Sequence, residues 1–224
     1  MQSRRKYIRE AVIVLLVTLG MSGIRSVLQL VASLSRPLNE QSVTLNAPQS
    51  DVAWTNVALQ LTSVATLVAW GLLVLYLLDD WPRPSWRDVL PGAGLAAIIG
   101  LPGLALYVVA LQAGWTKEVV ISGSAVSLLW AFGNAFAEET IVVKYLYDRF
   151  GPARSGPAWG VLILAAVLRG SYHLYQGVSA FFGNAAMGLI YGYYYHRTRR
   201  VWPLIFGHFL IDAVAFVGYP LLHS

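Results

Sequence analysis

The sequence contains no cysteine and few charged residues. Without cysteine among its 224 residues, the chain can form no disulfide bond, no thiolate metal site and no cysteine nucleophile. Only 12% of the residues are charged, whereas 57% are hydrophobic. Long apolar runs at this low charge density indicate an integral membrane protein rather than a soluble domain.

The sequence also lacks a linker. No charged or Gly/Ser-rich stretch is long enough to separate two folded domains, so we predict a single membrane-embedded domain over residues 1–224. The net charge of +5 would suit a nucleic-acid partner. However, the basic residues stand in short segments beside apolar runs, a pattern typical of topology signals. We therefore expect the lipid bilayer, and no nucleic acid, as a partner.

Seven apolar runs are each close to the roughly 20 residues that cross a bilayer. The first run could instead be a secretory signal peptide, but it is long and has Arg25 where a cleavage region should be small and neutral. We therefore predict an all-α, polytopic transmembrane helix bundle. Its spans are Ala11–Leu34, Ala53–Leu78, Val89–Ala113, Val119–Asp148, Ala158–Gln176, Ser179–His196 and Val201–Leu222.

The basic residues between the runs predict the orientation. If the N-terminus is cytoplasmic, the inside segments hold eleven lysines and arginines, whereas the outside segments hold only Arg36 and Lys117. Such an asymmetry favours seven spans with the N-terminus inside. We expect a multi-pass protein of the plasma membrane of a prokaryote.

Ionisable side chains interrupt three of the runs. A charge inside the bilayer costs a few kcal/mol even on insertion scales, so such groups need partners or water. We expect them to converge on one water-filled pocket. The three pairs are Glu138–Glu139, Arg169–His173 and His208–Asp212.

Spacing within these pairs suggests chemical roles. Glu138 shares a helix face with Asn134, which could hydrogen-bond it, and could take a proton from water while a histidine orients that water. The other histidine could stabilise an oxyanion, with Asp212 fixing its tautomer. Glu139 is about 100° away around the helix, and we expect it to turn towards Lys144 or Arg169. The glutamate pair could also serve only as a structural ion pair with one of these bases.

A further pattern concerns packing in the sixth run. Asn184, Gly188 and Gly192 recur every four residues and share one helix face. Small residues in such a stripe let two helices approach closely, and Asn184 could hydrogen-bond across the contact.

Together, the three motifs resemble the CPBP family, the CAAX-protease and bacteriocin-processing (Abi) group of intramembrane endopeptidases. The resemblance covers about residues 120–222 and implies a peptidase acting on a membrane protein or peptide. It also implies Glu138 as general base, His173 as its partner in holding water, and Glu139 as an accessory carboxylate. His208 would stabilise the oxyanion, with Asp212 beside it.

Metal dependence is a separate question for this family. The glutamate mechanism requires no cofactor, and the sequence has no His-Glu-x-x-His segment, so we favour the metal-free reading. Zinc is the alternative, because two histidines and a carboxylate with water suit its tetrahedral site. Its ligands would be Glu138, His173 and His208.

Three positions depart from the family pattern. Val143 stands where the family usually has an arginine, Arg169 where it often has phenylalanine, and Asp212 where it often has asparagine. Arg169 could supply the missing cation from the next helix. A non-catalytic scaffold or immunity protein is therefore an alternative function. An ion-coupled transporter is less well supported, because inverted repeats are not visible.

Overall fold

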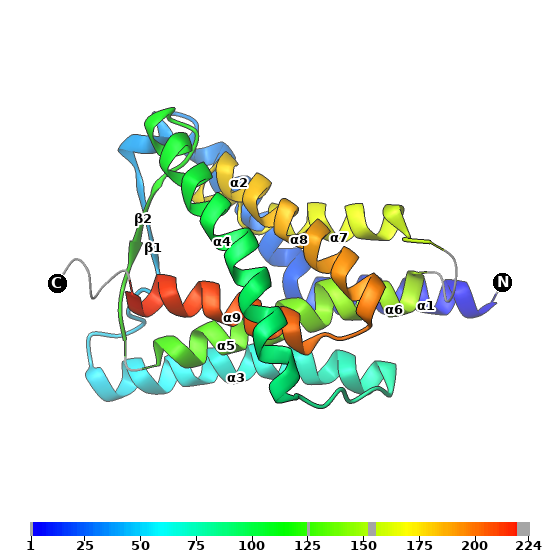
Figure 1. Cartoon of the computed structure of the whole chain (residues 1–224). Helices are drawn as coiled ribbons and strands as arrows, with labels where there is room; N and C mark the ends of the chain where they lie inside the picture. Colours follow the sequence, from blue (N-terminus) through cyan, green and yellow to red (C-terminus); the bar gives the residue numbers. More distant parts are fainter. Residues whose placement is uncertain (1, 125, 152–155, 219–224) are drawn as a thin grey trace. The chain divides into compact units, whose positions relative to one another are not determined.

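A computed structural model describes residues 2–124, 126–151 and 156–218 (Figure 1). These residues are mostly helical, which confirms the all-α prediction, although a small two-stranded sheet is also present. The chain forms two compact units, each assembled from separate segments. Unit 1 comprises Met1–Gln41, Gly103–Glu118 and Val142–Arg199, and unit 2 comprises Ser42–Pro102, Val119–Ile141 and Arg200–Ser224.

Unit 1 is built on the packing of α7 against α8. The four-residue spacing of Gly188 and Gly192 predicts that another helix packs closely against this face of α8, and the structure confirms it. A Cβ added at Gly188 would lie 3.0 Å from Ala166 Cα, and one at Gly192 would lie 2.8 Å from Leu162 Cδ2. Asn184 does not bridge the two helices as expected, since its amide donates to Ala180 O of its own helix. The helical segments of this unit are α1 (Gln2–Leu15), η1 (Leu16–Gly20), α2 (Met21–Ser33), η2 (Leu38–Glu40), α6 (Leu146–Phe150), α7 (Trp159–Ser171), η5 (Leu174–Gln176) and α8 (Val178–Thr198).

Unit 2 is built around α5, which packs against both α3 and α9 (Figure 1). Gly71 of α3 faces the Phe136 ring, and the Phe136 and Trp202 ring centroids are 6.3 Å apart. Strand β1 (Ser42–Leu45) pairs with β2 (Glu118–Ile121). The helical segments are α3 (Ala53–Leu78), η3 (Trp86–Asp88), the first part of α4 (Val89–Gln112), α5 (Ser127–Glu138), α9 (Trp202–Ala213) and η6 (Val214–Gly218).

Membrane character is carried by the long apolar helices. By length and composition, Arg5–Ser33, Ala53–Leu78 and Trp86–Gln112 could each cross a bilayer, and Trp159–Ser171 and Trp202–Gly218 are shorter apolar helices. These helices fit a membrane protein. The count of seven spans and the cytoplasmic N-terminus stay predictions, and residues 219–222 of the predicted last span lie outside the described residues.

Two predicted helix boundaries are wrong. The fourth run does not start as a helix at Val119, because Glu118–Ile121 is a strand and α5 begins only at Ser127. Three consecutive β-branched residues, Val119 to Ile121, favour the strand once β1 offers it a partner. The fifth run does not continue as one helix to Gln176, since α7 ends at Ser171.

Candidate active site

The two glutamates stand where α5 changes into a π-helix. Glu138 is the last residue of α5, and Glu139 is the first residue of the π-helix η4 (Glu139–Tyr145). Both are buried, with Glu139 completely enclosed and Glu138 8% exposed. A π-helix hydrogen-bonds from i to i+5, and such insertions are frequent at functional sites. From this pair onwards, successive side chains are therefore no longer spaced around the axis as they are in an α-helix.

Glu139 contacts His208 of α9 within unit 2. His208 Nδ1 lies 2.8 Å from Glu139 Oε1, and both side chains are buried. With the carboxylate ionised, Nδ1 carries a proton and donates it to Glu139. An ionised acceptor in a low-dielectric interior makes this hydrogen bond stronger than a neutral one. Glu139 thereby sets the orientation of the imidazole.

Asp212 lies on the other side of the same ring. As predicted, His208 and Asp212 share one face of a helix, and Asp212 Oδ2 is 3.6 Å from His208 Nε2. This separation is too long for a good hydrogen bond but close enough for electrostatic attraction. The tautomer-fixing partner expected from the sequence was Asp212, whereas the shorter contact in the structure is with Glu139.

The backbone around His208 is held by close packing between α4 and α9. A Cβ added at Gly92 would lie 2.9 Å from Pro203 O and 3.2 Å from Gly207 N. Only a glycine lets the two helices approach this closely, one residue before the histidine. His208 is therefore placed by backbone contact as well as by its hydrogen bond to Glu139.

Arg169 and His173 belong to unit 1. Arg169 is fully buried near the end of α7, and its guanidinium lies 5.8 Å from the centroid of the Tyr191 ring, within cation–π distance. His173 follows the end of the helix, so the prediction that this pair lines one helix face is wrong. Convergence of His173 with Glu138 and His208 stays a prediction.

The segment after α7 is held in place at Gly177. This residue has φ +130°, a conformation that residues with a side chain rarely adopt. A Cβ there would also lie 2.5 Å from Thr116 Cα, because Thr116 and Gly177 form an antiparallel bridge. The bridge fixes the turn after His173, whose Nδ1 is 3.4 Å from Gln176 Nε2.

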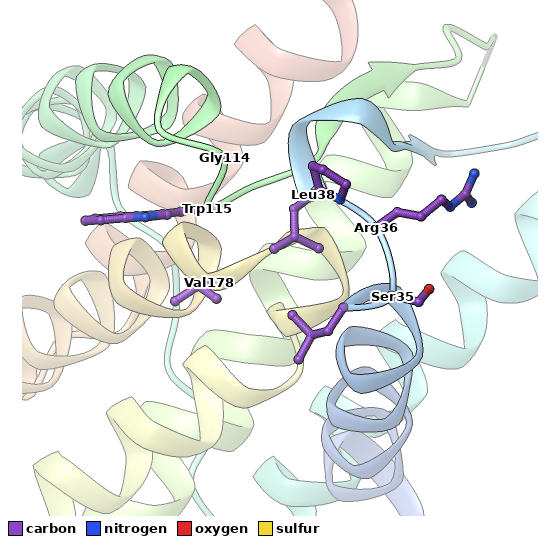
Figure 2. A pocket seen from close by; sticks show the side chains of 8 residues that line it. Ser35, Arg36, Leu38, Gly114, Trp115 and Val178 are labelled. Atoms are coloured by element: carbon purple, nitrogen blue, oxygen red, sulfur yellow. The ribbon is translucent and has the colours of Figure 1, made fainter.

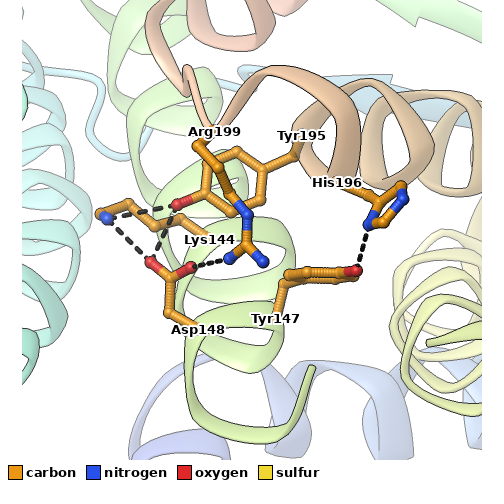
Figure 3. Close-up of polar contacts among 6 residues, drawn as sticks. All are labelled: Lys144, Tyr147, Asp148, Tyr195, His196 and Arg199. Atoms are coloured by element: carbon orange, nitrogen blue, oxygen red, sulfur yellow. Dashed lines mark hydrogen bonds and ion pairs between the residues drawn. The ribbon is translucent and has the colours of Figure 1, made fainter. Parts of the chain in front are cut away.

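Lys144 has partners that the sequence analysis missed. Its Nζ lies 2.8 Å from Asp148 Oδ2 and 3.3 Å from the Tyr195 hydroxyl (Figure 3). The four-residue interval between Lys144 and Asp148 is the signal that would have found the ion pair. Asn134 is half-buried, and in the part of the chain that the structure describes its side chain makes no hydrogen bond to Glu138.

Among the described residues, no three histidine, aspartate or glutamate side chains are arranged to hold a metal ion. The proposed zinc ligands come from both units, with His173 in unit 1 and Glu138 and His208 in unit 2. Zinc therefore stays an alternative, and the chemistry below is derived from the side chains alone.

Residues 120–214 match the family model described as "Rce1-like: Type II CAAX prenyl endopeptidase Rce1-like". The match spans the glutamate pair, the Arg169–His173 motif and the His208–Asp212 motif, and it confirms the resemblance to the CPBP group. No curated protein and no solved structure shows a significant match to the chain.

Proposed function

Because residues 120–214 match the Rce1-like family model of type II CAAX prenyl endopeptidases, we propose that the protein is an intramembrane endopeptidase with a glutamate-activated water. Its substrate would be a peptide bond of a membrane-associated protein or peptide. The family supports a hydrolase of the CAAX-protease type, and the apolar helices support a membrane location.

The buried contact between Glu139 and His208 carries this proposal. Enclosing a carboxylate and an imidazole costs desolvation energy, which a single hydrogen bond does not fully recover. Such arrangements are concentrated at sites where protonation states change during a reaction. Glu138, the adjacent residue, is buried in the same segment and is the proton acceptor that the motif supplies.

In the proposed reaction, Glu138 first accepts a proton and later returns it. Glu138 takes a proton from water as the water oxygen attacks the carbonyl carbon of the scissile peptide. Protonated His208 donates Nδ1–H to Glu139 and Nε2–H to the developing oxyanion, with Asp212 next to Nε2. When the C–N bond breaks, Glu138 returns its proton to the leaving amine. His173 would help to hold the water.

The first experiment is cleavage of a fluorogenic membrane peptide with a C-terminal CAAX sequence, prepared with and without a prenyl group. Purified protein in detergent should cleave at least one form, and Glu138→Gln should reduce kcat/KM by roughly a hundredfold or more. Glu118→Gln, at an exposed strand position, is the matched control and should keep activity. Equal rates for Glu138→Gln and the control would contradict the mechanism.

A chelator arm of the same assay tests the zinc alternative. Loss of activity with chelator and recovery with added Zn²⁺ would replace the metal-free mechanism. Unchanged rates would support it. The expected result is that the rate with chelator equals the rate without it.

One observation favours a non-catalytic relative. Val143 replaces the usual arginine and is buried at 2% exposure, so this position offers no cation to the site. If neither peptide is cleaved and Glu138→Gln leaves the protein's stability and cellular function unchanged, a membrane scaffold or immunity protein becomes the better reading.

We also propose seven spans, a cytoplasmic N-terminus and a location in a prokaryotic plasma membrane. Reporter fusions at Ser42 and Arg199 should report opposite sides, with Ser42 outside. Reporters that land on the same side would exclude this topology.

A further inference from the structure

A second polar pair joins distant parts of unit 1. Lys117 Nζ lies 2.6 Å from Ser33 Oγ, although the two residues are 84 positions apart. Ser33 is the last residue of α2, and Lys117 immediately precedes β2. The family match begins only at residue 120, so neither residue is part of it.

Lys117 is buried without an opposite charge. Its side chain is 8% exposed, and among the described residues it forms no ion pair with Glu40 or Glu118, the acidic residues of the adjoining segments. The other ionisable groups on neighbouring segments are Arg36, His173 and Tyr175. Burial lowers the pKa of Lys117 below its ordinary value. Its neutral amine, which can accept a proton, is therefore populated at a lower pH than in an exposed lysine.

We propose that Ser33 and Lys117 form a second reactive centre, in which the lysine amine removes the proton of the serine hydroxyl and the serine oxygen attacks an ester. A serine activated by a lysine is a recurring combination of nucleophile and base. Lys117 Nζ donates to Ser33 Oγ at 2.6 Å, so the two groups are within hydrogen-bond reach, and the neutral amine would accept the hydroxyl proton over the same distance.

The reaction balances without a cofactor. The Ser33 hydroxyl proton moves to Lys117 Nζ as Oγ bonds to the ester carbonyl carbon. The C–O bond to the alcohol then breaks, and the alcohol leaves with the proton from Nζ. Water hydrolyses the acyl-serine by the same route, with Lys117 again accepting and returning a proton.

A groove beside the pair indicates the kind of ester. It has a volume of about 450 Å³ (Figure 2). Leu34 and Ser35, which directly follow the nucleophile in the sequence, are among its lining residues. Leu38, Trp115 and Val178 provide apolar walls. An apolar acyl chain suits this lining better than a polar one. We therefore expect acyl esters with a hydrocarbon chain.

A structural role for the pair makes a different prediction. An ammonium group near the C-terminal end of a helix interacts favourably with the helix dipole, and Ser33 Oγ also lies 2.7 Å from Gln29 O within α2. If Lys117 served only in this way, Ser33 would be unreactive, and an arginine at position 117 would replace the lysine without a chemical consequence.

The test is labelling of the purified full-length protein with an alkyl fluorophosphonate, followed by peptide mapping, from about pH 6 to about pH 10. Ser33 should be labelled, and labelling should increase with pH as the amine loses its proton. Lys117→Arg keeps the charge but is no base in this range, so labelling should fall about tenfold or more. Ser42→Ala, at an exposed position of β1 outside the groove, should be labelled like the wild type.

No label on Ser33 of the wild-type protein, or equal labelling in Lys117→Arg, would overturn the proposal. The first of these two readouts uses the wild-type protein, so it does not depend on a variant that folds. Ser33→Ala should leave peptide cleavage intact, and Glu138→Gln should leave Ser33 labelling intact. Failure of either centre is thereby distinguished from failure of the other.

Discussion

The π-helix η4 contributes residues to two clusters of buried ionisable groups, and the two clusters differ in chemical character. Glu139 contacts His208 in unit 2, and Lys144 contacts Asp148 in unit 1. In the second cluster Asp148 also accepts hydrogen bonds from the Tyr195 hydroxyl at 2.8 Å and Arg199 Nη1 at 3.1 Å (Figure 3). This cluster therefore combines one carboxylate with a lysine, an arginine and a tyrosine hydroxyl.

The first cluster combines a histidine with two carboxylates. Histidine is the side chain whose ordinary charge change falls near neutral pH, whereas an arginine stays protonated. A set of fixed opposite charges holds elements together, and a set that contains histidine can also move a proton. Burial alone does not separate the two cases, but the identity of the partners does.

Substitutions in the glutamate pair should have the largest effect on activity and should distinguish the two clusters most clearly. Glu138→Gln should lower kcat/KM by roughly a hundredfold or more with an unchanged melting temperature, because it removes the base and keeps the shape. Activity and melting temperature should be measured in the same detergent. A large loss of stability with full activity per folded molecule would assign Glu138 to structure.

Glu139→Gln should affect both quantities. It weakens the hydrogen bond that orients His208, so activity should fall about tenfold or more. The melting temperature should also fall, because a buried group loses its charged partner. His208→Gln provides the comparison, and the double variant should lose less than the sum of both single losses. Additive losses would show that the two residues act independently.

Asp148→Asn should destabilise the protein without changing the reaction. Lys144 is 2% exposed, so the substitution removes the carboxylate that lies 2.8 Å from a buried ammonium group. We expect a loss of about 2–4 kcal/mol in the free energy of unfolding, because Asp148 itself is partly exposed. Denaturant titration measures this loss. A large fall in kcat of the folded fraction would show that this cluster also supports the reaction.

Arg199→Gln in the same cluster should have a smaller effect. Its side chain is 43% exposed, and exposed ion pairs contribute about 0–1 kcal/mol. A loss as large as that of Asp148→Asn would contradict the assignment of the buried Lys144 as the main partner. The same titration at high salt should reduce the effect further.

The smallest effect concerns Lys117, a buried lysine that forms no ion pair among the residues that the structure describes. Because its folded-state pKa lies below the ordinary value, the unfolded chain binds more protons between the two values. Stability should therefore rise as pH increases through the folded pKa and level off near the ordinary lysine pKa of about 10.4. Lys117→Gln should remove this part of the pH dependence of the melting temperature. An unchanged slope would show that Lys117 is not its source.

Local patterns in the sequence were sufficient for the class of protein and for much of the site. Hydropathy predicted the apolar helices, and four-residue spacing placed His208 and Asp212 on one face and Gly188 and Gly192 at a close helix contact. These predictions succeed because they depend on helical periodicity within one segment. The three-motif order also identified the family before the match over residues 120–214 confirmed it.

Only the tertiary structure decided which ionisable groups meet. Glu139 contacts His208 across 69 residues of sequence, a pairing that no spacing predicted, and the strand at Glu118–Ile121 forms because β1 is available as a partner. The turn after His173 is held by the bridge between Thr116 and Gly177. Each outcome is set by contacts between distant segments, whose distances and desolvation costs no local pattern contains.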